Sequence, residues 1–147
     1  MLRKLFFCFI TSLFFFGWFE TEAQIDQTDH WESLIYPYQE WHYLPATSEP
    51  PSNWNDLTFD DSLWAIGPGG IGYADDDDST EIQPTISLYM RMKFDLVDTS
   101  NITDMLFYID FDDAFVAYIN GTEIARSNIA GTTPAFNMEA NSPREAT

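Results

Sequence analysis

The chain has 147 residues, of which 17% are aromatic and 24 are acidic against 6 basic, so its formal net charge is −18. This length allows one domain, and the aromatic content is too high for an acidic disordered segment. The negative charge repels nucleic acid and anionic membrane surfaces, so the composition excludes both as partners.

Residues 1–23 have the pattern of a secretory signal peptide. A basic start precedes an apolar run at residues 5–19, and Thr21 and Ala23 supply the small residues of a cleavage site. Cleavage after Gln24 fits equally well. The alternative, a membrane anchor, needs roughly 20 apolar residues, which is more than this run provides. We therefore expect export to the medium or the cell surface and no membrane span.

Cleavage at this site also removes Cys8, the single cysteine of the chain. The mature chain would then contain no thiol. Disulfides, thiolate metal ligands and cysteine nucleophiles are excluded for it, and its stability outside the cytoplasm has to come from the core.

Polar residues 24–33 form a lead-in to the first candidate strand. Residues 34–44 carry scattered aromatic side chains but are interrupted by Pro37, which suits an edge strand or an extended entry better than a central strand. Residues 46–53 contain Pro-Pro with Ser and Asn, which predicts a loop.

Two turns are predicted within residues 54–73. The Asp-Asp-Ser sequence at residues 60–62 offers acceptors for a capped turn, and Phe59 and Trp64 can pack beneath it. The glycine-rich residues 67–73 lack the strand and helix that flank a phosphate-binding loop, and an acidic run follows them. We therefore expect a turn with closely packed backbone at this point.

Residues 88–96 show the clearest strand pattern. Leu, Met, Met, Phe and Leu alternate with Tyr, Arg, Lys and Asp, which is the period of a strand buried on one face. Arg91 and Lys93 fall on the predicted outer face, where we expect them to pair with carboxylates of neighbouring strands.

Residues 105–128 are predicted as a strand, an acidic turn at residues 110–113, a second strand, a hairpin and a third strand. Asn120 and Gly121 separate two β-prone runs, and Asn-Gly accepts the two positive φ angles of a type I′ turn. No segment keeps a helical period, so we expect an all-β fold. Residues 129–147 add no closing strand, which predicts that the sequence is a piece of a larger protein.

Five motifs follow one another along the chain. They are W-x-Y-L at residues 41–44, F-D-D-S-x-W at 59–64, G-x-G-G-I-G-Y at 67–73, L-Y-x-R at 88–91 and D-D-x-F-V-A-Y-x-N-G-x-E-I-A-R at 112–126. Together they resemble the galactose-binding-like jelly-roll modules of large secreted bacterial proteins. Such modules often accompany spore-coat-H-type kinase-like domains, lamin-tail domains or sorting domains.

The resemblance implies an antiparallel β-sandwich or jelly roll over residues 34–147, with further domains downstream in the same protein. Two departures from the pattern stand out. Ala74 replaces a glycine that usually follows the tyrosine, and the last strand of such modules, with its N-V-L-A-I type of core, is absent. We therefore expect a module that lacks its last strands.

A structural calcium ion is the one metal that the residues suggest. The candidate ligands are the aspartates of two acidic runs, Asp75, Asp76, Asp77, Asp78, Asp110, Asp112 and Asp113. They supply enough oxygen atoms for the roughly six to eight ligands that calcium takes, and modules of the resembled type often hold calcium. The spacing is not that of an EF-hand, and the alternative is a solvated acidic surface.

Aromatic rings beside amide and charged groups are the candidate sugar-binding elements. The candidate residues are Trp54, Tyr73, Asn120 and Arg126. The alternative is that the tryptophans belong to the core and that Arg126 pairs with a carboxylate.

Nothing in the sequence has the pattern of a catalytic site. His30 and His42 lie near no G-x-S-x-G motif, and a paired-carboxylate glycosidase is the remaining catalytic alternative. We expect a non-catalytic accessory module that binds a glycan or another extracellular ligand. The alternative is a structural spacer stabilised by calcium, with activity in downstream domains.

Overall fold

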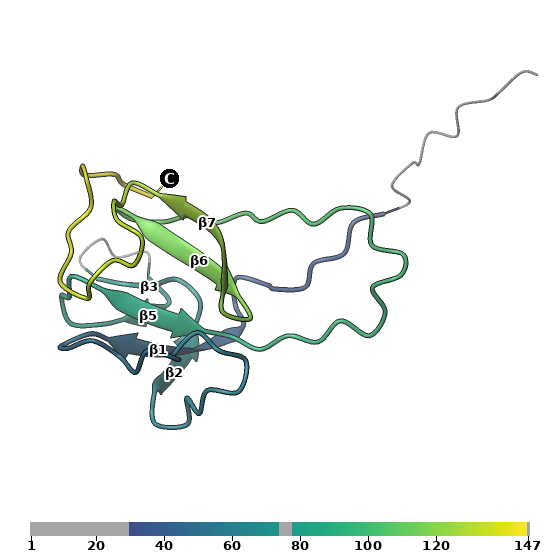
Figure 1. The fold of residues 1–147 in the computed structure, drawn as a ribbon, viewed down its shortest axis with the longest axis horizontal. Helices are drawn as coiled ribbons and strands as arrows, with labels where there is room; N and C mark the ends of the chain where they lie inside the picture. Colours follow the sequence, from purple (N-terminus) through teal and green to yellow (C-terminus); the bar gives the residue numbers. More distant parts are fainter. Residues whose placement is uncertain (1–29, 74–77, 147) are drawn as a thin grey trace, which may run out of the picture. The chain divides into compact units, whose positions relative to one another are not determined.

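The computed structural model describes residues 30–73 and 78–146, and its strands all lie in the unit formed by residues 31–147. The predicted signal peptide and most of the predicted lead-in therefore lie outside the described residues. The described residues contain seven strands and no helix, so the fold is all-β as predicted (Figure 1). The strands are β1 (Glu40–Pro45), β2 (Ala65–Pro68), β3 (Ile71–Gly72), β4 (Thr80–Glu81), β5 (Leu88–Arg91), β6 (Phe115–Ile119) and β7 (Thr122–Ser127).

The largest sheet is antiparallel and has the order β2-β1-β5. β1 is its central strand, which contradicts the prediction of an edge strand for residues 34–44. The physical reason is the position of Pro37, which precedes the first strand residue, Glu40. The proline is thus outside the ladder and removes no hydrogen bond from it.

β5 is shorter than the predicted strand and ends at Arg91. The prediction that Arg91 lies on an exposed face is wrong, because its side chain is only 9% exposed. The loop that contains Trp54 and Asp61 covers this face and supplies oxygen acceptors to the guanidinium. Lys93 is 60% exposed, as expected of an outer-face lysine.

An aromatic cluster connects β5 with β6. The Trp54 ring lies 4.8 Å from the Tyr89 ring of β5 and 5.7 Å from the Tyr118 ring of β6, and it stacks on Trp64 at 6.4 Å. These rings are half-buried. Ile82 is the one apolar residue among the described ones that is buried, at 8% exposure. Packing in the described unit therefore depends on contacts between aromatic rings that are themselves only half-buried.

β6 and β7 form the predicted hairpin. Asn120 and Gly121 connect them with φ angles of 49° and 79°, which confirms the turn expected from the Asn-Gly pair. The register shifts between Ala117, which pairs with Ala125, and Tyr118, which pairs with Glu123. This shift leaves one extra residue on β7 and makes a β-bulge there.

The glycine-rich segment packs closely, as predicted. A Cβ atom added to Gly67 would lie 2.6 Å from Oγ1 of Thr80, which is closer than real Cβ contacts come. Beyond this point β3 and β4 form a short parallel pair, with Ile71 opposite Thr80. Residues 74–77, between β3 and β4, lie outside the described residues.

Residues 105–109 do not form the predicted strand. β6 pairs only with β7 in the described structure, so this β-prone segment has no ladder to join. The described residues after β7 contain no further strand, as expected. No helix in the described ranges has the length and apolar character that crossing a membrane requires.

Candidate functional site

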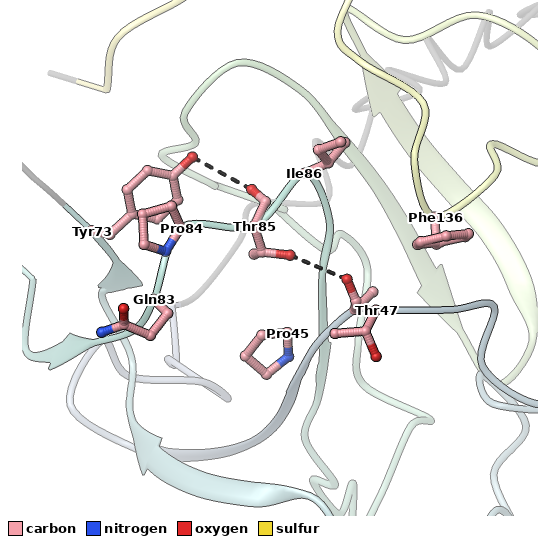
Figure 2. A pocket seen from close by; sticks show the side chains of 9 residues that line it. Pro45, Thr47, Tyr73, Gln83, Pro84, Thr85, Ile86 and Phe136 are labelled. Atoms are coloured by element: carbon pink, nitrogen blue, oxygen red, sulfur yellow. Dashed lines mark hydrogen bonds between the residues drawn. The ribbon is translucent and has the colours of Figure 1, made fainter.

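A cavity of about 470 Å³ opens beside the carboxyl end of β1. Residues 45–47, residues 83–86, Tyr73 and Phe136 line it. Figure 2 shows Tyr73 and Gln83 on one side of the opening and Phe136 on the other. The volume falls within the range of small-molecule sites.

Hydrogen bonds from Thr85 hold one wall of this cavity against β1. The Thr85 hydroxyl lies 3.1 Å from the carbonyl oxygen of Ser87 and 3.4 Å from that of Ala46, and the Ala46 N–H donates to Ser87 at 2.9 Å. The Tyr73 hydroxyl donates to the carbonyl oxygen of Thr85 at 3.4 Å (Figure 2). The tyrosine ring is therefore oriented by the same residue that fixes the wall.

The opposite wall comes from the segment after β7. The Phe136 N–H donates to Oε1 of Glu49 at 2.9 Å, so a carboxylate in the loop after β1 fixes the backbone of this segment. The two aromatic rings thus reach the cavity from parts of the chain 63 positions apart in the sequence, at Tyr73 and Phe136.

The groups that line the cavity favour a neutral polar ligand. The lining contains no charged residue. Tyr73 is 40% exposed, and Gln83 and Thr47 are exposed as well. An aromatic ring, an amide and a hydroxyl in one opening can bind a molecule that has an apolar face and several hydroxyl groups.

Of the four predicted sugar-binding residues, Tyr73 is the one that lines the cavity of about 470 Å³. Trp54 lies in the aromatic cluster, and its carbonyl oxygen accepts a hydrogen bond from Arg91. Asn120 occupies the tip of the β6–β7 hairpin and is exposed. Neither residue lines the cavity at Tyr73.

Arg126 pairs with a carboxylate, which was the predicted alternative to sugar binding. Its Nε and Nη2 atoms lie 2.5 and 2.6 Å from the two oxygens of Glu123. It also donates to the carbonyl oxygens of Gly131 and Thr132. The hydrogen bond from Arg126 lowers the pKa of Glu123, so this pair stays ionised and tethers the chain after β7.

A second cavity, of about 410 Å³, contains a network of charges around Asp61. The Arg91 Nε donates to Oδ2 of Asp61 at 2.8 Å, and the Lys93 ammonium lies 3.8 Å from Oδ1. Nδ1 of His42 lies 2.9 Å from the carbonyl oxygen of Asp61. Only 10% of the Asp61 side chain is exposed, so its carboxylate is buried in this network.

The predicted capped turn contains this aspartate. Asp60 accepts a hydrogen bond from the Ser62 N–H at 3.1 Å, and the Trp64 N–H donates to the Asp61 carbonyl oxygen at 3.0 Å. Phe59 and Trp64 pack edge to face at 5.7 Å, as expected.

Opposing effects act on the pKa of Asp61. Burial raises it, but the hydrogen bond from Arg91 and the charges of His42 and Lys93 outweigh burial, so the pKa lies below the ordinary value of 3.8. Every nitrogen of the Arg91 guanidinium has a protein acceptor, since Nη1 donates to Trp54 and Nη2 to Asp56. The network therefore holds the loop against β5 through all three guanidinium nitrogens.

Arg144 binds the acidic turn at residues 110–113. The Arg144 guanidinium stacks on the Phe111 ring at 3.9 Å and lies 3.7 Å from Asp110. The backbone N–H of Arg144 donates to Oδ1 of Asp113 at 2.9 Å. Asp112 accepts the N–H of Asp113 at 3.1 Å. Residues 30–73 and 78–146 contain no group of three or more acidic, histidine or cysteine side chains placed to hold a metal ion.

The other predicted calcium ligands are mostly outside the described structure. Asp75, Asp76 and Asp77 belong to residues 74–77, and Asp78 is the one member of their run that is described. Asp78 is half-buried and immediately precedes the turn into β4.

Sequence reasoning missed Gln83, Thr85 and Phe136 as lining residues. No local pattern marks them, because each lies in a segment that reads as a loop and the cavity exists only once three distant stretches meet.

Comparison of the chain with protein-family models, curated proteins and solved structures finds no match.

Proposed function

We propose that the chain is a non-catalytic, carbohydrate-binding accessory module, a β-sandwich of the galactose-binding-like type in a secreted or cell-surface protein. The observation that carries the proposal is the cavity at Tyr73, where an exposed aromatic ring lies beside an amide and a hydroxyl group in an uncharged lining. Sugars present an apolar C–H face and a rim of hydroxyl groups, and this combination of side chains is complementary to both.

The strands support the proposed module type through the motifs they carry. W-x-Y-L lies in β1 and L-Y-x-R in β5, and these strands are neighbours in one antiparallel sheet. The longest motif spans β6, the Asn-Gly turn and β7. In this proposal, Arg91 of L-Y-x-R and Asp61 of F-D-D-S-x-W serve the fold, because they bind each other.

The absence of a catalytic role in the proposal rests on how the charged groups are used. The Arg91 nitrogens donate to protein oxygens, and Nδ1 of His42 faces the Asp61 backbone. A paired-carboxylate hydrolase needs two carboxyl groups that face each other across an open cleft. The lining of the cavity at Tyr73 includes no carboxyl group, and in the second cavity, which Glu40 and Asp61 line, the Asp61 carboxylate is bound by Arg91.

Titration with free galactose, followed by a panel of immobilised glycans, tests the proposal on the full chain. We expect a dissociation constant on the order of 1 mM for a single sugar, as is usual for so small a ligand. The variant Tyr73→Ala should weaken binding at least about tenfold, because it removes the stacking surface. Tyr38→Ala is the matched control, since Tyr38 is 73% exposed and does not line the cavity.

Two results would contradict the proposal. One is the absence of binding to every glycan by a chain whose melting curve shows that it is folded. The other is equal weakening by Tyr73→Ala and Tyr38→Ala, since this would place the contact outside the cavity. The first result favours the structural spacer, and the second moves the glycan site away from the cavity.

A further inference from the structure

The connection between β5 and β6 contains five consecutive apolar residues that are exposed to solvent. The exposed fractions are 57% for Met105, 79% for Leu106, 48% for Phe107, 86% for Tyr108 and 38% for Ile109. No other run of this length occurs among the described residues. Contiguous apolar surface on a folded chain marks an interaction site, because its contact with water is unfavourable.

The exposure alternates along this segment in the way that side chains alternate on a β-strand. Leu106 and Tyr108 are the most exposed, and the residues between and beside them are less so. The Phe107 ring lies 6.1 Å from the Phe115 ring of β6. One side of the segment is therefore packed toward β6 through Phe107, and the other side faces solvent.

The backbone of residues 105–109 is open as well. No hydrogen bond joins it to another described residue. Figure 1 shows the connection as a long loop outside the labelled strands. Its Phe, Tyr and Ile residues favour β structure. A β-prone segment with free N–H and C=O groups is the kind of edge to which a second strand can add.

The charges around the segment determine which strand fits it. Between Lys93 and Arg126 the chain has no lysine or arginine. It has seven carboxylates there, at Asp95, Asp98, Asp104, Asp110, Asp112, Asp113 and Glu123. Arg126 pairs with Glu123 and Arg144 lies against Asp110, so these two cations offset part of the charge and leave an excess of carboxylates. A second copy of this chain would bring the same charge and be repelled, whereas a strand with basic ends is attracted.

We propose that residues 105–109 are a docking strand for another polypeptide. The partner is an extended segment with apolar side chains at alternate positions and with lysine or arginine at its ends. It adds to residues 105–109 by main-chain hydrogen bonds, while its basic ends face the acidic residues that flank the segment. This surface shares no residue with the cavity at Tyr73, so an experiment can disprove the docking strand and leave the proposed sugar site untouched, or the reverse.

The test uses the full chain and two synthetic peptides of roughly nine residues, the length of a long strand. Both have an alternating valine and threonine centre; one carries two lysines at each end and the other two glutamates. Hydrogen exchange maps the contact. We expect the lysine peptide to bind at least about tenfold more tightly at low salt and to slow exchange of the amides of residues 105–109.

Leu106→Pro supplies the matched variant. Proline removes one N–H and cannot join a ladder, and Leu106 is exposed, so the fold should be unaffected. Val97→Pro is the control, because Val97 is 101% exposed and lies in the same connection. We expect Leu106→Pro to abolish peptide binding and Val97→Pro to leave it unchanged, with equal melting temperatures for both variants.

Several outcomes would overturn the proposal. They are the absence of binding to either peptide, equal binding of both peptides, protection confined to other residues, and binding that survives Leu106→Pro. A chain that is dimeric without peptide and already protected at residues 105–109 would show that a second copy is the occupant, which also overturns it.

Discussion

At the scale of single residues, one buried ion pair decides how the loop after β1 is held. The side chains of Arg91 and Asp61 are 9% and 10% exposed, and their charged atoms are 2.8 Å apart. Removing one partner of such a pair leaves the other buried and unpaired, which costs about 3–5 kcal/mol. The pair is therefore a point where a single substitution loosens the loop from the sheet.

The lowered pKa of Asp61 leads to a prediction about acid stability. Because the pKa in the folded state is below the ordinary value of 3.8, the ionised carboxylate stabilises the fold above that value. This contribution is lost as the pH falls through the lower, folded-state pKa. We expect the free energy of unfolding, measured in urea, to decrease as the pH is lowered from about 5 to about 2, and to decrease more for the wild type than for Asp61→Asn.

The same variant should be destabilised by about 3 kcal/mol at neutral pH, because Arg91 then lacks its charged partner. Lys93→Ala is the control, since that ammonium is 3.8 Å away and 60% exposed, and we expect a change below about 0.5 kcal/mol. Parallel pH profiles for wild type and Asp61→Asn would contradict the role given to this carboxylate.

At the scale of elements, the β6–β7 hairpin rests on two residues with positive φ. Gly121 has a φ of 79°, where a Cβ is strained and would also lie 3.2 Å from Oδ1 of Asp56. We expect Gly121→Ala to lower the free energy of unfolding by about 1–2 kcal/mol. Urea unfolding monitored by circular dichroism measures the change.

Asn120→Gly is the matched control, because glycine accepts the φ of 49° at that position without strain. We expect its stability to stay within about 0.5 kcal/mol of the wild type. Equal destabilisation by the two variants would argue against a turn that depends on positive φ.

The elements also show where sequence reasoning succeeds and where it fails. The Asn-Gly hairpin and the turn at residues 60–62 were predicted correctly, because local backbone chemistry determines both. The position of β1 was predicted wrongly, since it depends on which strands meet in space. Residues 105–109 have the composition of a strand, but a strand also needs a neighbour, and composition does not supply one.

In the candidate site, too, local features could be predicted from the sequence and long-range contacts could not. Tyr73 was predicted as a sugar-binding candidate because it is aromatic, and it lines the cavity, whereas Phe136 and Gln83 enter the cavity only through long-range contacts. Arg91 was predicted to pair with a carboxylate, and it does, but the partner lies in a loop rather than on a neighbouring strand. Pairing between charges could thus be predicted from the sequence, and burial could not.

At the scale of the whole molecule, a net charge of −18 opposes compaction. Screening should relieve this repulsion, since the Debye length falls from about 30 Å at 0.01 M salt to about 8 Å at 0.15 M. We expect the melting temperature to rise by several degrees over that range of salt concentration, which corresponds to a gain of about 1 kcal/mol in the free energy of unfolding. A melting temperature independent of sodium chloride would contradict this expectation.

Calcium chloride at matched ionic strength separates screening from specific binding. A larger rise than sodium chloride gives, reversed by a chelator, would support the calcium site predicted for the acidic runs. Equal rises with the two salts would indicate that these aspartates form a solvated surface.

The position of Trp54 between β5 and β6 has an optical consequence. Its indole ring is 4.8 Å from the Tyr89 ring and 5.7 Å from the Tyr118 ring. Its fluorescence emission therefore responds to whether the β6–β7 hairpin is packed against the sheet that contains β5. Trp54 is therefore an intrinsic fluorophore at the junction of the two elements. Comparing wild type with Trp54→Phe separates its signal from that of the other tryptophans, and the timing of hairpin docking can be followed without an attached dye.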